Sequence, residues 1–168
     1  IVETLTMFGE RIGVAFQLAD DLVDLTSSDG ESGKTQGRDL REGVHTLPAL
    51  LAMASDDPAD DRLRELLSAP LADDGDHAEA LALLLAHPAV EQARAEARRW
   101  ADEALQTLAP LPDIPARRAL ELLCDYVKTA TRDGRPLKDD PVIRQRIAQL
   151  VTECEVARVL GVKFVDAA

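Results

Sequence analysis

Three aspartates, Asp20, Asp21 and Asp24, stand in an otherwise apolar run of the chain, FQLADDLVD. On a helix, residues three and four apart share a face, so these carboxylates project to one side. Like charges at that spacing destabilise an isolated helix by about 0.2–0.5 kcal/mol per pair. A hard divalent cation would offset the repulsion, and Mg²⁺ takes oxygen ligands and often joins one or two carboxylates to substrate phosphates. The run predicts a magnesium site; the alternative is a solvated acidic helix face, which is common in acidic chains.

The residues that follow form a glycine-punctuated segment in which two cations come directly after glycines. Lys34 follows Gly33 and Arg38 follows Gly37, so both come soon after the acidic run. Cations on this loop and a metal on the carboxylates would grip opposite sides of one phosphate group. We therefore expect an anion clamp here, although Lys34 taken singly also fits an ordinary solvated loop lysine.

Together these residues carry a family resemblance. The segment from Gly9 to Leu51 resembles the second aspartate-rich region of the trans-type isoprenyl diphosphate synthases, the polyprenyl synthetases. Its pattern is F-Q-x-x-D-D-x-x-D, then G-K-x-x-G-x-D-L, then G-x-x-T-L-P. A weaker resemblance continues to about residue 126. The matching positions are Gly13, Phe16, Gln17, Asp20, Asp21, Asp24, Gly33, Lys34, Gly37, Asp39, Leu40, Gly43, Thr46, Leu47 and Pro48.

The resemblance implies a Mg²⁺-dependent transferase of isoprenoid biosynthesis that condenses an allylic prenyl diphosphate with isopentenyl diphosphate. Asp20 and Asp21 would be metal ligands, with Asp24 a ligand directly or through water. On the substrate side, the resemblance implies that Lys34 contacts the diphosphate, that Gln17 and Phe16 line the wall near the reacting carbon, and that Asp39 orders the loop. It names no catalytic acid or base in this chain.

The resemblance also implies that this chain holds only part of such an enzyme. The family's first aspartate-rich motif and its upstream basic residues have no counterpart here, and Val44 stands where many members have a second lysine. We therefore expect a fragment that is inactive alone and that assembles through its helices as a homodimer or heteromer. The alternative is a non-catalytic helical accessory subunit of a heteromeric prenyl synthase.

Composition excludes several other functions. The chain has 19 basic and 31 acidic residues, a net charge of −12, which argues against nucleic-acid or anionic-membrane partners. The sequence shows no apolar run long enough to span a membrane, and its start lacks signal-peptide features, so we expect a cytoplasmic protein. Cys124 and Cys154 have neither metal-ligand nor disulfide spacing and read as reduced core thiols.

The pattern of apolar residues predicts an all-α protein, a partial helical bundle of the isoprenoid synthase type with an additional C-terminal helix. The chain is rich in Ala and Leu, has few aromatics, and shows almost no strand signal. Residues 27–42 are expected to be loop, and the three histidines to be scattered loop or cap residues. The helices are expected at 3–26, near 46–54 with Thr46 as cap, 59–68, 77–86, 88–108 and 116–130.

The last part of the chain carries a second resemblance. A turn G-x-P-L at Gly134 leads into a helix with R-Q-x-x-A at Arg144 and A-R-x-L at Ala157. From residue 126 to 162 this resembles the entry to the C-terminal helical domain of acyl-CoA dehydrogenases. Thr131 replaces the arginine that contacts flavin in many of those enzymes. We expect two parts, 1–126 and 127–168, the second being either a fused piece of that kind or an amphipathic helical tail; a flavoenzyme fragment is a third interpretation.

Overall fold

The computed structural model describes residues 1–26 and 36–133, and every regular element among them is helical. The all-α prediction is therefore confirmed for these residues, whereas Lys34, Cys154 and the expected C-terminal helix lie outside them. The elements are α1 (Val2–Thr26), α2 (Arg38–Glu42), α3 (Leu47–Met53), a 3-10 turn η1 (Pro58–Asp60), α4 (Asp61–Leu67), α5 (Asp74–Ala86), α6 (Ala89–Thr107) and α7 (Pro115–Asp133).

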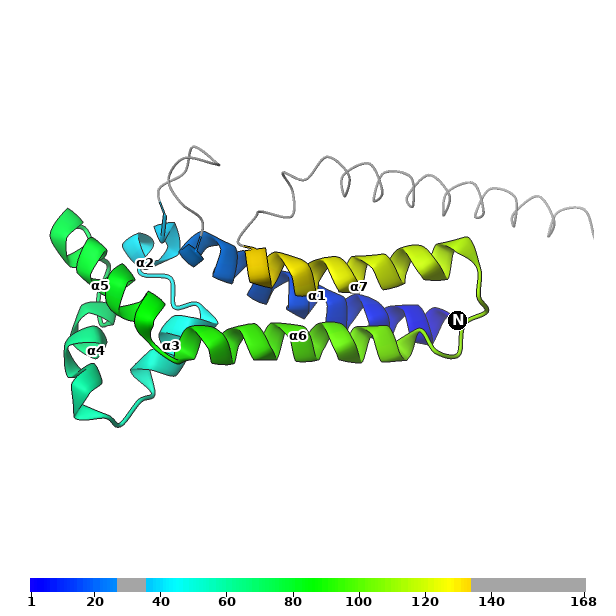
Figure 1. Ribbon diagram of the computed structural model, residues 1–168, viewed down its shortest axis with the longest axis horizontal. Coiled ribbons are helices and arrows are strands. Elements are labelled where there is room, and N and C mark those ends of the chain that lie inside the picture. The colour runs from blue at the N-terminus through cyan, green and yellow to red at the C-terminus, as the bar shows by residue number, and fades with distance from the viewer. Residues whose placement is uncertain (27–35, 134–168) are drawn as a thin grey trace, which may run out of the picture.

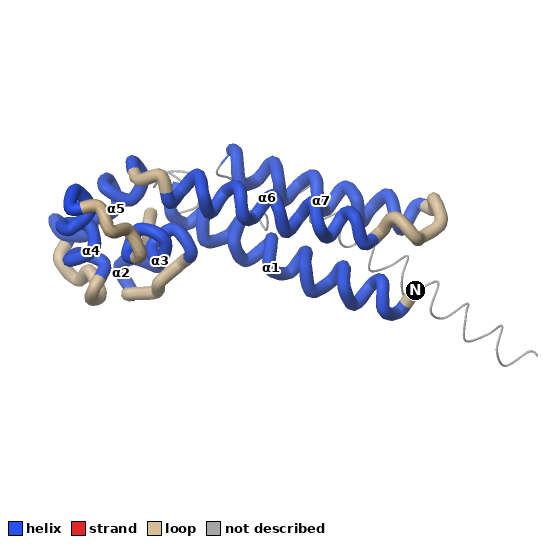
Figure 2. Tube along the Cα trace, turned by 90° about the horizontal axis from the view of Figure 1, so that it is seen from below, coloured by secondary structure: helices blue, strands red, loops and turns tan. Residues whose placement is uncertain are grey.

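Three long helices and a group of short ones form two regions (Figures 1 and 2). Helices α1, α6 and α7 lie side by side along the long axis, with α6 running opposite to the other two (Figure 1). Helices α2 to α5 gather at the end where α1 finishes and α6 begins. The aspartate run lies in the last part of α1, so it is at the end of the bundle where the short helices gather.

Small residues hold the long helices together. Ala15 and Ala19 of α1 are fully buried with Ala101 and Ala104 of α6, and Cys124 and Val127 of α7 belong to the same cluster. Alanines at the contact let helix axes approach closely, since the distance between axes depends on the side chains there. Cys124 is a free thiol whose pKa burial raises to about 11, so it packs as a small apolar group.

A second cluster lies under the short helices. It joins Leu22 and Leu25 at the end of α1 to Leu40, Leu84 and Val90. Leu22 and Leu84 are fully buried, which ties the aspartate-bearing part of α1 to both α5 and the start of α6. The core thus holds α1 by the face opposite to the exposed Asp20.

Some helix limits differ from the sequence expectations. Residues 38–42 are a helix, α2, because Gly37 takes a positive φ of 65° and starts a turn that Gly43, at φ 73°, ends. Helix α5 begins at Asp74 rather than 77, because the Asp73 side chain accepts from Gly75 and Asp76 and caps it. Thr46 stands at the N-cap of α3 but makes no side-chain cap hydrogen bond.

Within residues 1–26 and 36–133, none of the helices combines the length and apolar character that crossing a bilayer requires. A cytoplasmic location stays a prediction.

Ala101→Leu tests the close packing of the long helices. Ala101 is fully buried, so the larger side chain should lower the free energy of unfolding by about 1–3 kcal/mol through overpacking. The matched control is Ala95→Leu, on the exposed face of the same helix, which should change it by less than about 0.5 kcal/mol. Urea unfolding followed by circular dichroism measures both, and equal midpoints for the two variants would contradict this packing.

Candidate functional site

The end of α1 concentrates negative charge. Asp20 is exposed, whereas Asp21 and Asp24 are half-buried, and all three lie in the last two turns of the helix. Gln17, one turn earlier and exposed, donates a 2.8 Å hydrogen bond from Nε2 to the Asp21 carboxylate. Phe16 is partly buried and packs against the cluster of long-helix residues. The acidic run is therefore on a rigid, core-anchored helix, as a binding site requires.

Asp24 joins the end of α1 to residues 36–42 through hydrogen bonds. Its Oδ2 accepts a 3.1 Å hydrogen bond from the backbone N–H of Asp39, and its carbonyl oxygen accepts one of 2.9 Å from Gly37. Gln36 Nε2 also donates to the carbonyl of Leu25 at 2.8 Å. These bonds fold residues 36–42 back onto the end of α1, so Asp39 comes next to Asp24 although fifteen residues separate them.

The carboxylates at this end influence one another. Partial burial raises the pKa of Asp21 above its usual value, and the charges of Asp20 and Asp24 raise it further, while the hydrogen bond from Gln17 lowers it. The pKa of Asp39 is raised by burial first and then by Asp24 and Asp21. We name Asp20, Asp21, Asp24 and Asp39 the carboxylate cluster; a nearby cation would relieve this repulsion.

The chemistry of the donors fits a hard divalent cation, since all four side chains offer carboxylate oxygen. Among the described residues, no group of three or more His, Cys, Asp or Glu side chains is arranged to hold a metal ion by itself. Mg²⁺ does not need one, because it usually keeps several waters and takes one or two carboxylates plus substrate phosphates. The carboxylate cluster therefore fits an open magnesium site completed by a phosphate ligand, rather than a structural metal site.

Of the two cations expected to form the anion clamp, the structure describes one, Arg38. Lys34 lies outside the described residues. Arg38 begins α2 and its Nε donates a 2.7 Å hydrogen bond to Glu42 on the same helix, with more than half of its side chain exposed. Asp39 contributes backbone hydrogen bonds, donating to Asp24 and accepting from Val44 at 2.8 Å. Its part in ordering the segment thus involves its main chain.

The spacing of the aspartates recurs at Asp56, Asp57 and Asp60, with a different outcome. There the run forms a loop and the 3-10 turn η1, in which Asp57 caps the turn by accepting from Ala59. Asp60 accepts from Ser55 and contacts His87, and these hydrogen bonds lower its pKa. In this second run, the side chains of Asp57 and Asp60 are engaged in hydrogen bonds with neighbouring residues. The spacing of the aspartates alone therefore does not make a metal site.

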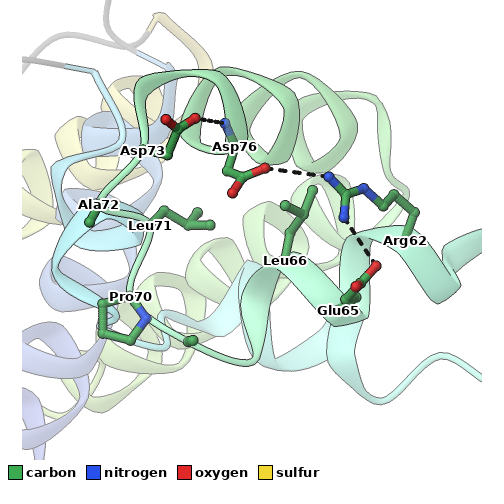
Figure 3. A pocket seen from close by; sticks show the side chains of 9 residues that line it. Arg62, Glu65, Leu66, Pro70, Leu71, Ala72, Asp73 and Asp76 are labelled. Carbon is green, nitrogen blue, oxygen red and sulfur yellow. Dashed lines mark hydrogen bonds and ion pairs between the residues drawn. The ribbon is translucent and has the colours of Figure 1, made fainter.

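A surface pocket of about 340 Å³ lies elsewhere, between α4, α5 and the loop that joins them (Figure 3). Its one cation, Arg62, is already held by Glu65, Asp76 and Glu79, with the shortest contact at 2.7 Å. The carboxylate cluster takes no part in its lining. A cation that three carboxylates already neutralise is poorly placed to bind an anion, so we locate the candidate site at the end of α1.

His77 is a functional candidate that the sequence pattern did not single out. It belongs to α5 rather than to a loop, is buried, and places Nε2 3.0 Å from the carbonyl oxygen of Gly37. Forty residues separate the two, so no local spacing could have revealed the contact.

Comparison with known proteins gives two family matches. A family model described as polyprenyl synthetase matches residues 1–84, half of the chain, which includes the carboxylate cluster. A second, described as the C-terminal domain of acyl-CoA dehydrogenase, matches residues 106–168 and so starts upstream of the resemblance seen in the sequence. Both resemblances found in the sequence are confirmed by these matches.

Individual relatives agree with the first match. Nonaprenyl diphosphate synthase of Mycobacterium tuberculosis is 48% identical over 133 residues, which cover 79% of this chain and 39% of that protein. Heptaprenyl diphosphate synthase component 2 of Geobacillus stearothermophilus is 34% identical, covering 76% and 39%. The chain spans about two fifths of the length of these relatives.

A solved structure shares the fold. Geranylgeranyl pyrophosphate synthase from Corynebacterium glutamicum, complexed with calcium and isoprenyl diphosphate, has a TM-score of 0.71 and 37% identity. The similarity covers 77% of this chain and 40% of that one.

Asp21→Asn tests the electrostatics of the cluster. Because the folded protein raises the pKa of Asp21 above 3.8, the folded state binds more protons than the unfolded state just above that pH, and stability falls as pH rises through this window. Asparagine avoids the loss while still accepting from Gln17. The variant should therefore be about 0.2–0.5 kcal/mol more stable than the parent at pH 7 and lose that advantage below pH 3.8.

Urea midpoints at several pH values measure this difference. Glu10→Gln is the control, since Glu10 is an exposed carboxylate of α1 outside the cluster. If the control gains as much stability at pH 7 as Asp21→Asn does, only net charge matters and the cluster is not coupled.

Proposed function

The chain belongs to the polyprenyl synthetase family, and from that premise we propose that it carries one aspartate-rich half of a trans-isoprenyl diphosphate synthase site. The whole enzyme would condense an allylic prenyl diphosphate with isopentenyl diphosphate. The observation that supports this most is the carboxylate cluster: three aspartates at the end of α1, with Asp39 hydrogen-bonded to Asp24 and the pKa values of Asp21 and Asp39 both raised. The similar enzyme of Corynebacterium glutamicum was solved as a complex with calcium and isoprenyl diphosphate. That complex supports a ligand of the same kind, a metal ion with a diphosphate, for the site in this chain.

Mg²⁺ is the cation we assign to the site. Asp20 and Asp21 would ligate it, and Asp24 would do so directly or through water with lone pairs left by its bond to Asp39. When bound, such an ion neutralises charge that develops on a departing diphosphate. The protein's own part is to hold the carboxylates on one rigid helix, so that little ordering is needed when the ligand arrives.

The remaining site residues receive supporting roles. Lys34 would contact the diphosphate, and Gln17 and Phe16 would line the wall beside the prenyl chain. Gln17 has a second role in the apo protein, because its bond to Asp21 stabilises the charged carboxylate. Asp39 orders residues 36–42 rather than touching the reacting atoms.

Asp20→Asn combined with Asp21→Asn tests the metal assignment. The parent should bind Mg²⁺ weakly in calorimetric titration, more tightly when inorganic pyrophosphate is present, and the double variant should lose at least tenfold in affinity. Asp56→Asn with Asp57→Asn is the matched control, since it makes the same charge change at the same spacing and Asn retains capping ability. Equal losses from the two pairs would refute a specific site.

Activity should require more than this chain. The site resembles one of the two aspartate-rich regions that the family uses, so the isolated polypeptide should incorporate no radiolabelled isopentenyl diphosphate with Mg²⁺ and an allylic primer. Incorporation above that of the Asp20→Asn, Asp21→Asn variant would contradict this proposal. A full-length synthase assayed in parallel shows that the substrates are competent.

A role as an accessory subunit is the second candidate, and the outer face of α1 favours it. Gly9 and Gly13 lie one turn apart in this helix, and a Cβ added at either would meet nothing within 4 Å. Glycine inside a helix costs about 0.5–1 kcal/mol relative to alanine, so the two glycines on this open face lower the stability of the isolated chain. We infer that a helix of another polyprenyl synthase chain packs here; the heptaprenyl diphosphate synthase relative of Geobacillus stearothermophilus is itself named as one component, component 2.

Gly9→Ala with Gly13→Ala separates folding from assembly. In the isolated chain both substitutions should be stabilising, together by about 1–2 kcal/mol in urea unfolding. They should nevertheless weaken co-purification with a full-length synthase, because the added methyl groups hinder close approach of a second helix. Ala95→Leu on exposed α6 is the control. Unchanged co-purification of the glycine variant would argue against this face as the interface.

The C-terminal part receives a narrower proposal. Helix α7 is continuous from Pro115 to Asp133 and buries Cys124 and Val127 against α1 and α6, so the packed unit extends through α7. The match to the acyl-CoA dehydrogenase domain begins within α6 and includes α7. We therefore propose that the boundary between the two parts of the chain lies after α7 rather than at residue 126.

A further inference from the structure

The buried imidazole of His77 has no part in the function proposed above. His77 is the fourth residue of α5 and only 5% exposed, and its Nε2 lies 3.0 Å from the carbonyl oxygen of Gly37. A carbonyl oxygen only accepts, so Nε2 carries the proton and donates. The same carbonyl accepts the first bond of α2, from the N–H of Arg41 at 3.2 Å.

Gly37 is the point at which the segment turns onto α1. Its φ of 65° is left-handed, and a Cβ there would lie 3.1 Å from Leu81 Cδ1 and 3.3 Å from His77 Nε2. Both neighbours belong to α5, so this helix fits closely around the turn. On its other side, the N–H of Gly37 donates to the carbonyl of Asp24 at 2.9 Å.

A short line of hydrogen bonds therefore leads from α5 to the carboxylate cluster. His77 donates to Gly37, Gly37 donates to the main chain of Asp24, and two residues later Asp39 donates to the Asp24 side chain. Another polar link between α5 and α2 is the bond from Arg41 to Asp74 at 2.8 Å. Asp74 is 91% exposed, and surface ion pairs of that kind contribute little to stability.

We propose that His77 is a positioning residue for the carboxylate cluster. By holding the carbonyl of Gly37 it fixes the turn that sets the distance between Asp24 and Asp39. The inference rests on the proposed function only where it concerns metal binding; the hydrogen-bonded link is a property of the folded chain itself.

Two variants separate the donor from the packing. His77→Leu fills a similar volume without a donor, whereas His77→Gln retains an N–H near the position of Nε2. The backbone amides of Gly37 and Asp39 report on the turn through hydrogen exchange followed by NMR. In His77→Leu both should exchange about three- to tenfold faster than in the parent, as expected for the loss of one buried hydrogen bond. In His77→Gln they should stay near the parent rates, and the amide of buried Ala97 should be unchanged in both.

Unchanged rates at Gly37 and Asp39 in His77→Leu would overturn the proposal. So would equally fast exchange in His77→Gln, which would mean that only the imidazole's shape matters.

Mn²⁺ binding with inorganic pyrophosphate, measured by electron paramagnetic resonance, tests the consequence for the site. His77→Leu should bind Mn²⁺ at least threefold more weakly than the parent, and His77→Gln should restore the affinity. Equal affinities in all three proteins would overturn a positioning role toward the metal. If the parent itself binds no Mn²⁺, the proposed function fails, and the exchange rates alone then decide whether His77 fixes the turn.

Discussion

The packing of α1 against the alanine face of α6 is the interaction on which the rest of the structure depends. Ala15 and Ala19 are fully buried in it, which fixes the rotation of α1 about its own axis. Since side chains on a helix keep a fixed angular spacing, that rotation also decides the position of every other residue on α1. Asp20 is consequently exposed, Asp21 and Asp24 are half-buried, and the glycines of the outer face meet open space.

The short helices add a second constraint at the same end. They bring residues 36–42 back to α1, where Asp24 is both a member of a repelling group and the acceptor that holds Asp39. Burial first, and then the neighbouring carboxylates, raise the pKa of Asp21 and of Asp39, and Arg38, which is paired with Glu42, offsets only part of this at Asp39. A site of this kind gains from binding a cation because the ligand relieves a cost that folding has already imposed.

Much of this organisation could be predicted from the sequence, because the strongest patterns are local. The apolar period of residues 3–26 predicts α1 within a residue or two, and the motif from Phe16 to Pro48 predicts the family. The sequence pattern does not predict the start of α5, because the acidic residues around Asp73 have the composition of a loop although Asp73 caps the helix. It does not predict α2 either, because that helix depends on the left-handed backbone conformation of Gly37. His77 could not be found at all, since its partner is forty residues away and only tertiary packing joins them.

The central claim is that the carboxylate cluster binds a divalent cation together with a diphosphate. Crystals of the chain grown with Mn²⁺ and inorganic pyrophosphate test it most directly, since manganese is located by its anomalous scattering. The account predicts a manganese peak bonded to carboxylate oxygens of Asp20 or Asp21, with pyrophosphate on the ion's open side. Manganese bound only at Asp56 and Asp57, or pyrophosphate bound without a metal at the end of α1, would contradict it.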